Sequence, residues 1–380
     1  MADAEIIQLG SRSAGARRGR PADRARGAAD SPQETPIPDE PDPGVESEDV
    51  PPDPALIALL MELARLASQS LRGFRELTSV PIGRLGRLAG DPLHAVRSLA
   101  RVLGLGDEAL EDKVAFARQR LRGDYSVDEF GFDPEFTTKI FLPVLRRLAE
   151  TWFRVEVRGA ENLPTDGSAL LVSNHAGTLP LDAMILQTIV YDEIGRHVRM
   201  LGADLIFKVP YSGDLARKTG TTLACQEDAE RLLASNQLVS VFPEGFKGLG
   251  KPYADRYKLQ RFGRGGFVSA ALRAQVPIIP TAIVGSEEIY PLIARVPGLA
   301  KMLGLPYFPI TPLFPWLGPL GMIPLPSKWI IEFGEAITTD ELGSGAAEDP
   351  MIVFNITDQV RETIQQTLYA LLMQRRSAFS

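Results

Sequence analysis

Cysteine and histidine are scarce in this sequence of 380 residues, which has one Cys and three His. Because Cys225 has no second thiol to pair with, an internal disulfide is excluded, and a single cysteine is typical of a reducing compartment. His94, His175 and His197 with one cysteine are too few for the usual Cys/His zinc sites. We therefore expect neither a metal nor a bound cofactor.

Long apolar runs are also missing. No segment offers about 20 apolar residues without proline, so we expect no membrane-spanning helix. The N-terminus lacks an apolar core of about 7–15 residues, so we expect no secretory signal. The net charge of −7 provides no general basic surface, so nucleic acid is not an expected partner.

One stretch, residues 167–186, organises the rest of the chain. Residues 169–173 read Ala-Leu-Leu-Val-Ser, a short apolar run that predicts a buried strand ending at Asn174 and His175. Open α/β sheets bind ligands at the carboxyl ends of their strands. A histidine placed there can act as a general base, because its ordinary pKa lies near neutrality. The alternative is a structural histidine.

A helix is predicted soon after this histidine. Gly177 and Pro180 indicate a loop, and Asp182 stands directly before an apolar run, residues 183–190. An Asp in that position is also typical of a helix N-cap. On one continuous helix, seven positions span about 10 Å. Asp182 can therefore reach His175 only if the loop folds back.

A second apolar strand, residues 238–242, ends in Phe242-Pro243-Glu244-Gly245. Basic residues follow it, namely Lys247, Lys251, Arg256, Lys258, Arg261 and Arg264. A third strand carries Val276-Pro-Ile-Ile-Pro280. The Asn-His…Asp loop, the Phe-Pro-Glu-Gly strand end and the Val-Pro-Ile-Ile-Pro strand, in this order, resemble the glycerolipid/lysophospholipid acyltransferase family. The similarity extends over roughly residues 145–340 and is greatest to the branch that acylates mono- and diacylglycerol.

The resemblance implies an enzyme that moves a fatty acyl group from acyl-CoA, or from acyl carrier protein, to a hydroxyl of a glycerolipid or lysophospholipid. His175 would be the general base and Asp182 its partner. No Gly-x-Ser-x-Gly elbow is present, which argues against a serine hydrolase. The implied substrate-binding residues are Asn174, Gly177, Phe242, Pro243, Glu244, Gly245, Lys247, Lys258, Arg261 and Arg264.

Three departures from the commoner family pattern bear on the acceptor. Six residues separate His175 from Asp182, where four are usual, which favours the branch named above. Gln226 stands where many relatives have an Arg, and Phe246-Lys247 follows the second motif instead of an immediate Arg. A neutral glyceride or lysolipid is therefore as reasonable an acceptor as a phosphorylated glycerol. The basic residues fit CoA or acceptor phosphates, or simply a solvated surface.

Alternating strands and helices predict an α/β fold with one central, mostly parallel sheet flanked by helices. Strands are predicted at residues 155–157, 169–173, 198–201, 238–242, 277–283 and 329–333. Helices are predicted at residues 137–153, 182–193, 226–235, 265–274 and 351–375. A kink or a later start is expected at Pro143.

Four regions are expected along the chain. Residues 1–53, rich in Ala, Gly, Pro and charge and without aromatics, should be a disordered tail. Residues 54–136 should form a helical extension that ends in a linker, residues 124–136. Residues 137–345 should form the acyltransferase domain, and residues 346–380 a helix packed on it.

The segment of residues 289–327 is unusual. No charge occurs between Leu303 and Ser327, and seven prolines fall within residues 306–326. They exclude a continuous helix and favour an extended, polyproline-like path. The segment can line an acyl-chain groove, enter a lipid interface or pack as a long loop.

The sequence thus predicts a peripheral acyltransferase of phospholipid or neutral glycerolipid synthesis at the cytoplasmic face of a membrane. Two alternatives remain. One is a thioester or lipid hydrolase on the same scaffold, and the other is a non-catalytic protein that binds membrane lipids.

Overall fold

The computed structural model describes residues 115–378, apart from residues 117, 121, 124, 209–211, 264 and 303–305. These residues belong to one compact unit, Pro52–Ser380. The predicted disordered tail and the helices predicted before residue 115 lie outside the described residues. None of the described helices is long and apolar enough to cross a membrane.

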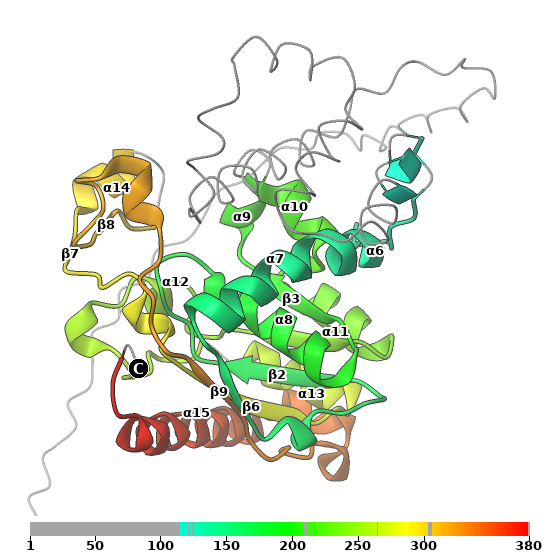
Figure 1. Ribbon diagram of the computed structural model, residues 1–380. Helices are drawn as coiled ribbons and strands as arrows, with labels where there is room; N and C mark the ends of the chain where they lie inside the picture. The colour runs from blue at the N-terminus through cyan, green and yellow to red at the C-terminus, as the bar shows by residue number, and fades with distance from the viewer. Residues whose placement is uncertain are drawn as a thin grey trace, which may run out of the picture. The chain divides into compact units, whose positions relative to one another are not determined.

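Seven strands of the described chain form one sheet, in the order β1-β9-β6-β2-β5-β3-β4 (Figure 1). They are β1 (Glu156–Arg158), β2 (Ala169–Ser173), β3 (Val198–Gly202), β4 (Thr221–Leu223), β5 (Leu238–Val241), β6 (Ile278–Val284) and β9 (Ile330–Phe333). Strands β6, β2, β5, β3 and β4 are parallel, whereas β9 runs antiparallel to β6 and parallel to β1. The predicted single, mostly parallel sheet is confirmed, with β4 as a strand that the sequence analysis missed.

Helices connect the parallel strands, because parallel neighbours need a crossover. They are α8 (Leu181–Ile194), α9 (Asp204–Lys208), α10 (Ser212–Lys218), α11 (Gln226–Ala234), α12 (Phe246–Leu249), α13 (Gly266–Ala274) and, after the last strand, α15 (Pro350–Gln374). Helix α8 ends at Gly195, which takes the left-handed conformation (φ 69°) and donates its N–H to Tyr191. The short helices α9 and α10 were not predicted.

The helix that precedes the sheet runs from Pro134 to Trp152. It consists of α6 (Pro134–Phe136), a π-helical turn (Thr137–Phe141), α7 (Leu142–Arg147) and a second π-helical turn (Leu148–Trp152). Asp133 is the N-cap of this helix, and its side chain accepts the backbone N–H of Phe136. Pro134, the first helical residue, has no backbone N–H that would need an acceptor. The predicted linker therefore ends three residues early. Pro143 is the second residue of α7, directly after the first π-helical turn. Of the expected kink or later start, the later start is wrong, because the helix already begins at Pro134.

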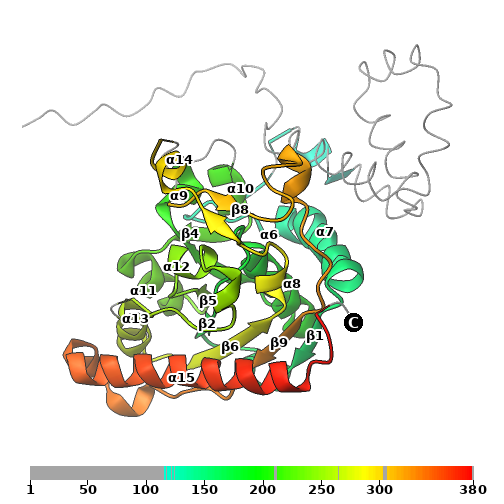
Figure 2. The ribbon, with the colours of Figure 1, turned by 90° about the vertical axis from the view of Figure 1, so that its left-hand side faces the viewer.

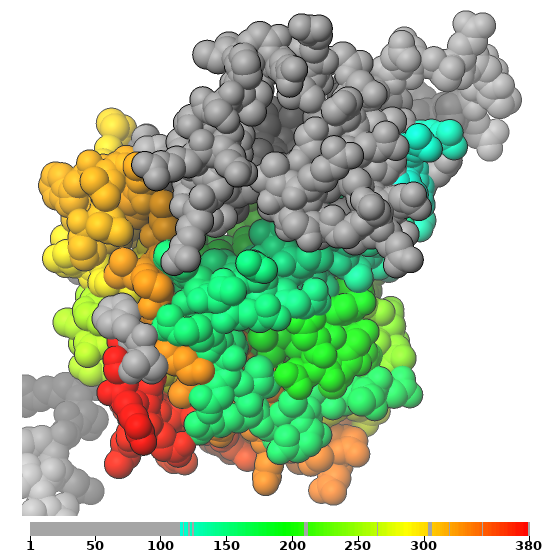
Figure 3. All heavy atoms as spheres, viewed as in Figure 1, coloured from blue at the N-terminus to red at the C-terminus, as the bar shows by residue number. Residues whose placement is uncertain are grey.

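Residues 289–326 form an excursion between β6 and β9. It contains β7 (Ala294–Arg295), α14 (Pro297–Met302), β8 (Pro309–Ile310) and a 3₁₀ turn (Gly318–Met322). Strands β7 and β8 pair with each other outside the main sheet. Figure 3 shows the yellow and orange atoms of this excursion gathered at one corner of the domain. The predicted extended path agrees with β8, but it is wrong for the 3₁₀ turn.

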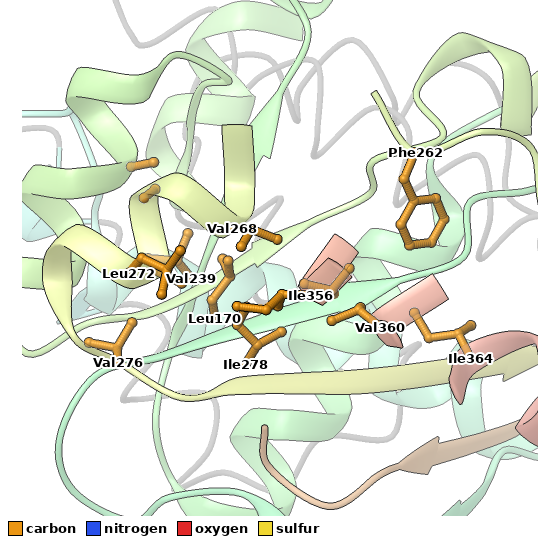
Figure 4. Close-up of a cluster of buried hydrophobic side chains, with 14 of the residues drawn as sticks. Leu170, Val239, Phe262, Val268, Leu272, Val276, Ile278, Ile356, Val360 and Ile364 are labelled. Carbon is orange, nitrogen blue, oxygen red and sulfur yellow. The ribbon is translucent and has the colours of Figure 1, made fainter. Parts of the chain in front are cut away.

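The two faces of the sheet carry separate cores, as alternation along β2 requires. Leu170 and Val172 belong to a cluster with α11, α13 and α15, and this cluster is drawn in Figure 4. Ala169 and Leu171 belong to a second cluster, which includes α7 and α8. Figure 2 shows α15 lying along the sheet. The sheet thus lies between two helical layers, which hold its strand ends in place.

Helix α15 should contribute strongly to stability because its buried side chains pack on the sheet. Ile364 is fully buried, so Ile364→Ala should cost about 2–5 kcal/mol in the free energy of unfolding. Met373 on the same helix is 89% exposed, so Met373→Ala should change it by less than about 0.5 kcal/mol. Urea denaturation followed by circular dichroism checks both. Equal effects would show that α15 does not pack as described.

Candidate active site

Three neighbouring strands carry the candidate site at their carboxyl ends. β2 pairs in parallel with β5 on one side and with β6 on the other. The residues that follow β2, β5 and β6 therefore meet at one edge of the sheet. They are His175 after β2, the motif Phe242–Gly245 after β5, and Glu287 after β6. This is the edge at which parallel sheets bind ligands.

His175 and Asp182 form a hydrogen-bonded pair at this edge. The distance between His175 Nδ1 and Asp182 Oδ2 is 2.8 Å. Asp182 is fully buried, and its carboxylate also accepts the backbone N–H groups of Ala176 at 2.8 Å and Ala183 at 2.9 Å. A carboxylate in this position fixes the proton of the neutral imidazole on Nδ1, which leaves Nε2 as the acceptor. The loop thus folds back, as the pairing requires.

Two left-handed residues fold the loop between the pair. Gly177 has φ 96° and Thr178 has φ 62°. A Cβ on Gly177 would lie 2.9 Å from the carbonyl oxygen of Ser286, so a side chain there would be excluded as well as strained. Tyr307 donates its hydroxyl to the carbonyl of Thr178 at 2.9 Å. The proline-rich excursion therefore holds the loop that brings His175 and Asp182 together.

Tyr307 stays protonated in this position. Its burial, and secondarily the charge of Asp182, raise the pKa of the phenol above its usual range. The hydroxyl is therefore a donor at every physiological pH, and its bond to Thr178 does not depend on titration.

Glu244 holds the backbone around the histidine. Its Oε1 accepts the backbone N–H of His175 at 2.9 Å, and its Oε2 accepts that of Gln260 at 2.6 Å. Lys251 Nζ lies 3.4 Å from the same Oε2. Glu244 is buried, so its carboxylate needs these donors. The contacts favour a role in positioning His175 over the predicted contact with substrate.

Lys251 connects Glu244 to a third buried carboxylate. Its Nζ lies 3.1 Å from Oε1 of Glu287, and the side chains of both residues are at most 5% exposed. Two carboxylates and one ammonium group are thus buried together, so an excess negative charge arises only when both carboxylates are ionised. Desolvation raises the pKa of Glu287 to about 7, against the opposing effect of the Lys251 charge.

An apolar cavity of about 630 Å³ opens beside the pair, within the usual size range of small-molecule sites. His175, Phe242 and Gly245 line it, together with α8, α9, α10 and the excursion. Residues from these surrounding elements include Leu179, Ala183, Met184, Leu205, Ile206, Leu215, Ala216, Tyr307, Phe308, Phe314 and Met322. None of the described residues that line the cavity is Lys, Arg, Asp or Glu. The cavity therefore suits an aliphatic chain that ends near His175.

Two further residues pack directly on His175. The ring of Phe242 lies 4.6 Å from the imidazole, centroid to centroid, so this motif residue shapes both the base and the cavity. A Cβ on Gly248 of α12 would approach the carbonyl oxygen of His175 to 2.6 Å and its Cβ to 3.1 Å. Glycine is thus the only residue type at position 248 that lets α12 pack against the backbone of His175.

Several predicted substrate-binding residues do not line the cavity in the described chain. Asn174 is fully buried, and its amide exchanges two hydrogen bonds with the backbone of Ile283 on β6. It extends the pairing of β2 with β6, so the prediction of a substrate contact is corrected to a structural role. Gly177 provides the left-handed backbone of the loop. The carbonyl of Pro243 accepts the backbone N–H of Gly263.

The predicted basic cluster is not one group. Lys251 is buried between carboxylates, and the exposed Lys258 pairs with Asp255 at 3.3 Å. Arg261 lines a separate groove beside α15. Lys247 is exposed, and Arg264 lies outside the described residues. The structure therefore gives these cations different surroundings.

The sequence analysis did not assign roles to Tyr307, Gly248 or Glu287. Glu287 carried the best available signal, since it follows a predicted central strand of the sheet within a Gly-Ser-Glu-Glu turn. Tyr307 and Gly248 act through contacts that no local pattern reveals.

Glu287 should make stability depend on pH. Its folded pKa of about 7 lies above the ordinary value of 4.5, so the native state favours the protonated form. This contribution is complete below pH 4.5 and is lost as the pH rises through 7. Glu287→Gln has no carboxyl group to ionise, so this variant should not lose that stability as the pH rises. Relative to wild type, the variant should gain on the order of 3 kcal/mol between pH 4.5 and 8, measured by urea denaturation. Parallel pH profiles would contradict the assignment.

Comparison with known proteins places this site in a family. The family model described as Acyltransferase matches residues 154–284. An uncharacterized protein of Mycobacterium tuberculosis is 62% identical over 266 residues, covering 70% of this chain and 74% of that protein. The human "DGAT1/2-independent enzyme synthesizing storage lipids" is 30% identical over 132 residues, 35% of this chain and 40% of the relative.

A solved structure is also similar. It is the crystal structure of the 1-acyl-sn-glycerophosphate (LPA) acyltransferase PlsC from Thermotoga maritima, with a TM-score of 0.43 and 19% identity. The match covers 64% of this chain and 85% of that one. The family model and the sequence relatives confirm the resemblance seen in the three motifs, and the chain belongs to the glycerolipid/lysophospholipid acyltransferase family.

Proposed function

We propose that this protein transfers a fatty acyl group from a thioester donor, acyl-CoA or acyl carrier protein, to a hydroxyl of a glycerolipid acceptor. One observation carries the proposal: a His-Asp pair stands at an apolar cavity that can receive an aliphatic chain. The reaction needs a base and a means of holding both reactants, and these two features supply them.

The proposed mechanism is direct transfer. Nε2 of His175 takes the proton of the acceptor hydroxyl while the oxygen attacks the thioester carbonyl carbon and a C–O bond forms. The tetrahedral intermediate then collapses, the C–S bond breaks, and the leaving thiolate receives the proton from the imidazolium. Asp182 stabilises the imidazolium through Nδ1 in the interval. Charge and protons balance without a covalent acyl-enzyme.

For the acceptor, the structure favours a neutral glyceride. The described cavity lining carries no cation, Lys251 is held between two carboxylates, and Lys258 pairs with Asp255. A phosphate beside the cavity would therefore find few free positive charges among the residues predicted to bind it. The human relative's name, which refers to storage lipids, agrees with this choice. Such acceptors dissolve in membranes, so we propose that the enzyme acts at a membrane surface.

Removing the base should slow turnover strongly. His175→Ala should lower kcat by about 10²–10⁴-fold, because a general base contributes about that much. The assay uses purified protein and labelled acyl-CoA with monoacylglycerol, diacylglycerol, lysophosphatidic acid, glycerol-3-phosphate or no acceptor. His197→Gln is the matched control, since the His197 ring packs on Phe132 and Tyr191 and not in the cavity. It should retain activity.

Each outcome of this assay has a distinct meaning. A labelled glyceride that disappears in His175→Ala but persists in His197→Gln would support the proposal and identify the acceptor. Free fatty acid released at the same rate with and without acceptor would point instead to a hydrolase. Product formation that survives His175→Ala in a folded variant would contradict the mechanism.

A further inference from the structure

The excursion between β6 and β9 exposes a set of large apolar side chains that we call the apolar tip. Its members are Ile293, Met302, Trp316, Leu317, Leu320 and Ile323. Trp316 is 73% exposed and Met302 is 75% exposed. Several such residues on one short excursion are typical of an interaction surface.

The charges of the excursion have one sign. Between Ile289 and Ser327 the only charged residues are Arg295 and Lys301, and no Asp or Glu occurs. Both of these cations are exposed. A surface that joins apolar and aromatic side chains to cations is complementary to a bilayer with anionic headgroups, because the cations meet the headgroups while the apolar groups enter the interface.

The apolar tip also leads to the active site. The same excursion supplies Tyr307, Phe308, Phe314 and Met322 to the lining of the cavity that contains His175. The same excursion therefore supplies both the exposed apolar side chains and part of the cavity lining. A bilayer that met the tip would contact an element that also borders the cavity.

Trp152 extends the surface from another element. It ends the helix that precedes the sheet, is 38% exposed, and donates its indole N–H to the carbonyl of Pro324 at 2.9 Å. A tryptophan with an anchored polar edge and an exposed ring is characteristic of membrane interfaces.

We propose that the apolar tip docks the enzyme on an anionic lipid bilayer, so that acyl chains reach the cavity from the membrane. The proposal rests on the proposed acyl transfer for its purpose, but the docking is measured without turnover. A second copy of this chain is the alternative occupant of the tip, and the experiment distinguishes it from a bilayer.

The test is vesicle sedimentation with the full chain. The vesicles contain phosphatidylcholine alone or phosphatidylcholine with phosphatidylglycerol. Wild type should bind the anionic vesicles more strongly. Trp316→Glu combined with Leu320→Glu should lower the partition coefficient at least tenfold. The matched control is Met351→Glu with Phe354→Glu, two exposed apolar residues of α15, which should bind like wild type.

Tryptophan fluorescence locates the contact. The chain has three tryptophans, and Trp329 is fully buried, so Trp152→Phe leaves Trp316 as the exposed one. Its emission should shift to shorter wavelength on anionic vesicles and be quenched by brominated lipid. Binding without this shift would place the membrane contact elsewhere and overturn the proposal.

The remaining outcomes are equally decisive. Unchanged vesicle binding by the tip variant would assign membrane contact to another part of the chain. A wild type that neither binds vesicles nor stays monomeric in sedimentation velocity, with a monomeric tip variant, would make the tip an interface between copies. Either result overturns the proposal. Vesicle binding that depends on the tip, in a protein without acyl transfer, would instead overturn the proposed function and retain the docking.

Discussion

The hydrogen bond from His175 to Asp182 is the constraint on which the candidate site depends. Six residues separate the two, so the chain must reverse between a strand end and a helix start. The reversal requires left-handed backbone at Gly177 and Thr178, and it is closed by Ala176 and Ala183, whose N–H groups both bind the carboxylate. One buried carboxylate thus orients the imidazole and organises the loop around it. Asp182 is the second residue of α8 and not its N-cap, so its carboxylate binds the loop and the imidazole instead of capping the helix.

Segments far apart in the sequence hold this loop. Tyr307 binds it from the proline-rich excursion, and Glu244 binds the backbone of His175 from the neighbouring strand end. Lys251 links Glu244 to Glu287, which lies in the turn after β6. Burying the ionised carboxylate of Glu287 lowers the free energy of unfolding, as its raised pKa indicates. We interpret that cost as a consequence of fixing the base rigidly beside an apolar cavity, where few other groups can orient it.

The sequence predicted the central strands and the His-Asp pair well, because those depend on local patterns: apolar runs of strand length, and Gly and Pro in the connecting loop. It failed where long-range contacts decide. Asn174 looked like a substrate ligand, but β6 uses its amide, which only the strand order reveals. The basic residues looked like one cluster, yet one of them is enclosed by carboxylates from two strand ends. Proline spacing predicted an extended path, whereas residues 318–322 form a 3₁₀ turn.

The central claim is that Asp182 holds the proton of His175 on Nδ1, so that Nε2 is the free base. Nitrogen-15 NMR of histidine-labelled protein tests it most directly, since the chain has only three histidines and single substitutions assign their signals. We expect neutral His175 to have a protonated Nδ1 and an unprotonated Nε2, and Asp182→Asn to lose this preference. A proton on Nε2 in the wild type, or a tautomer unchanged by Asp182→Asn, would contradict it.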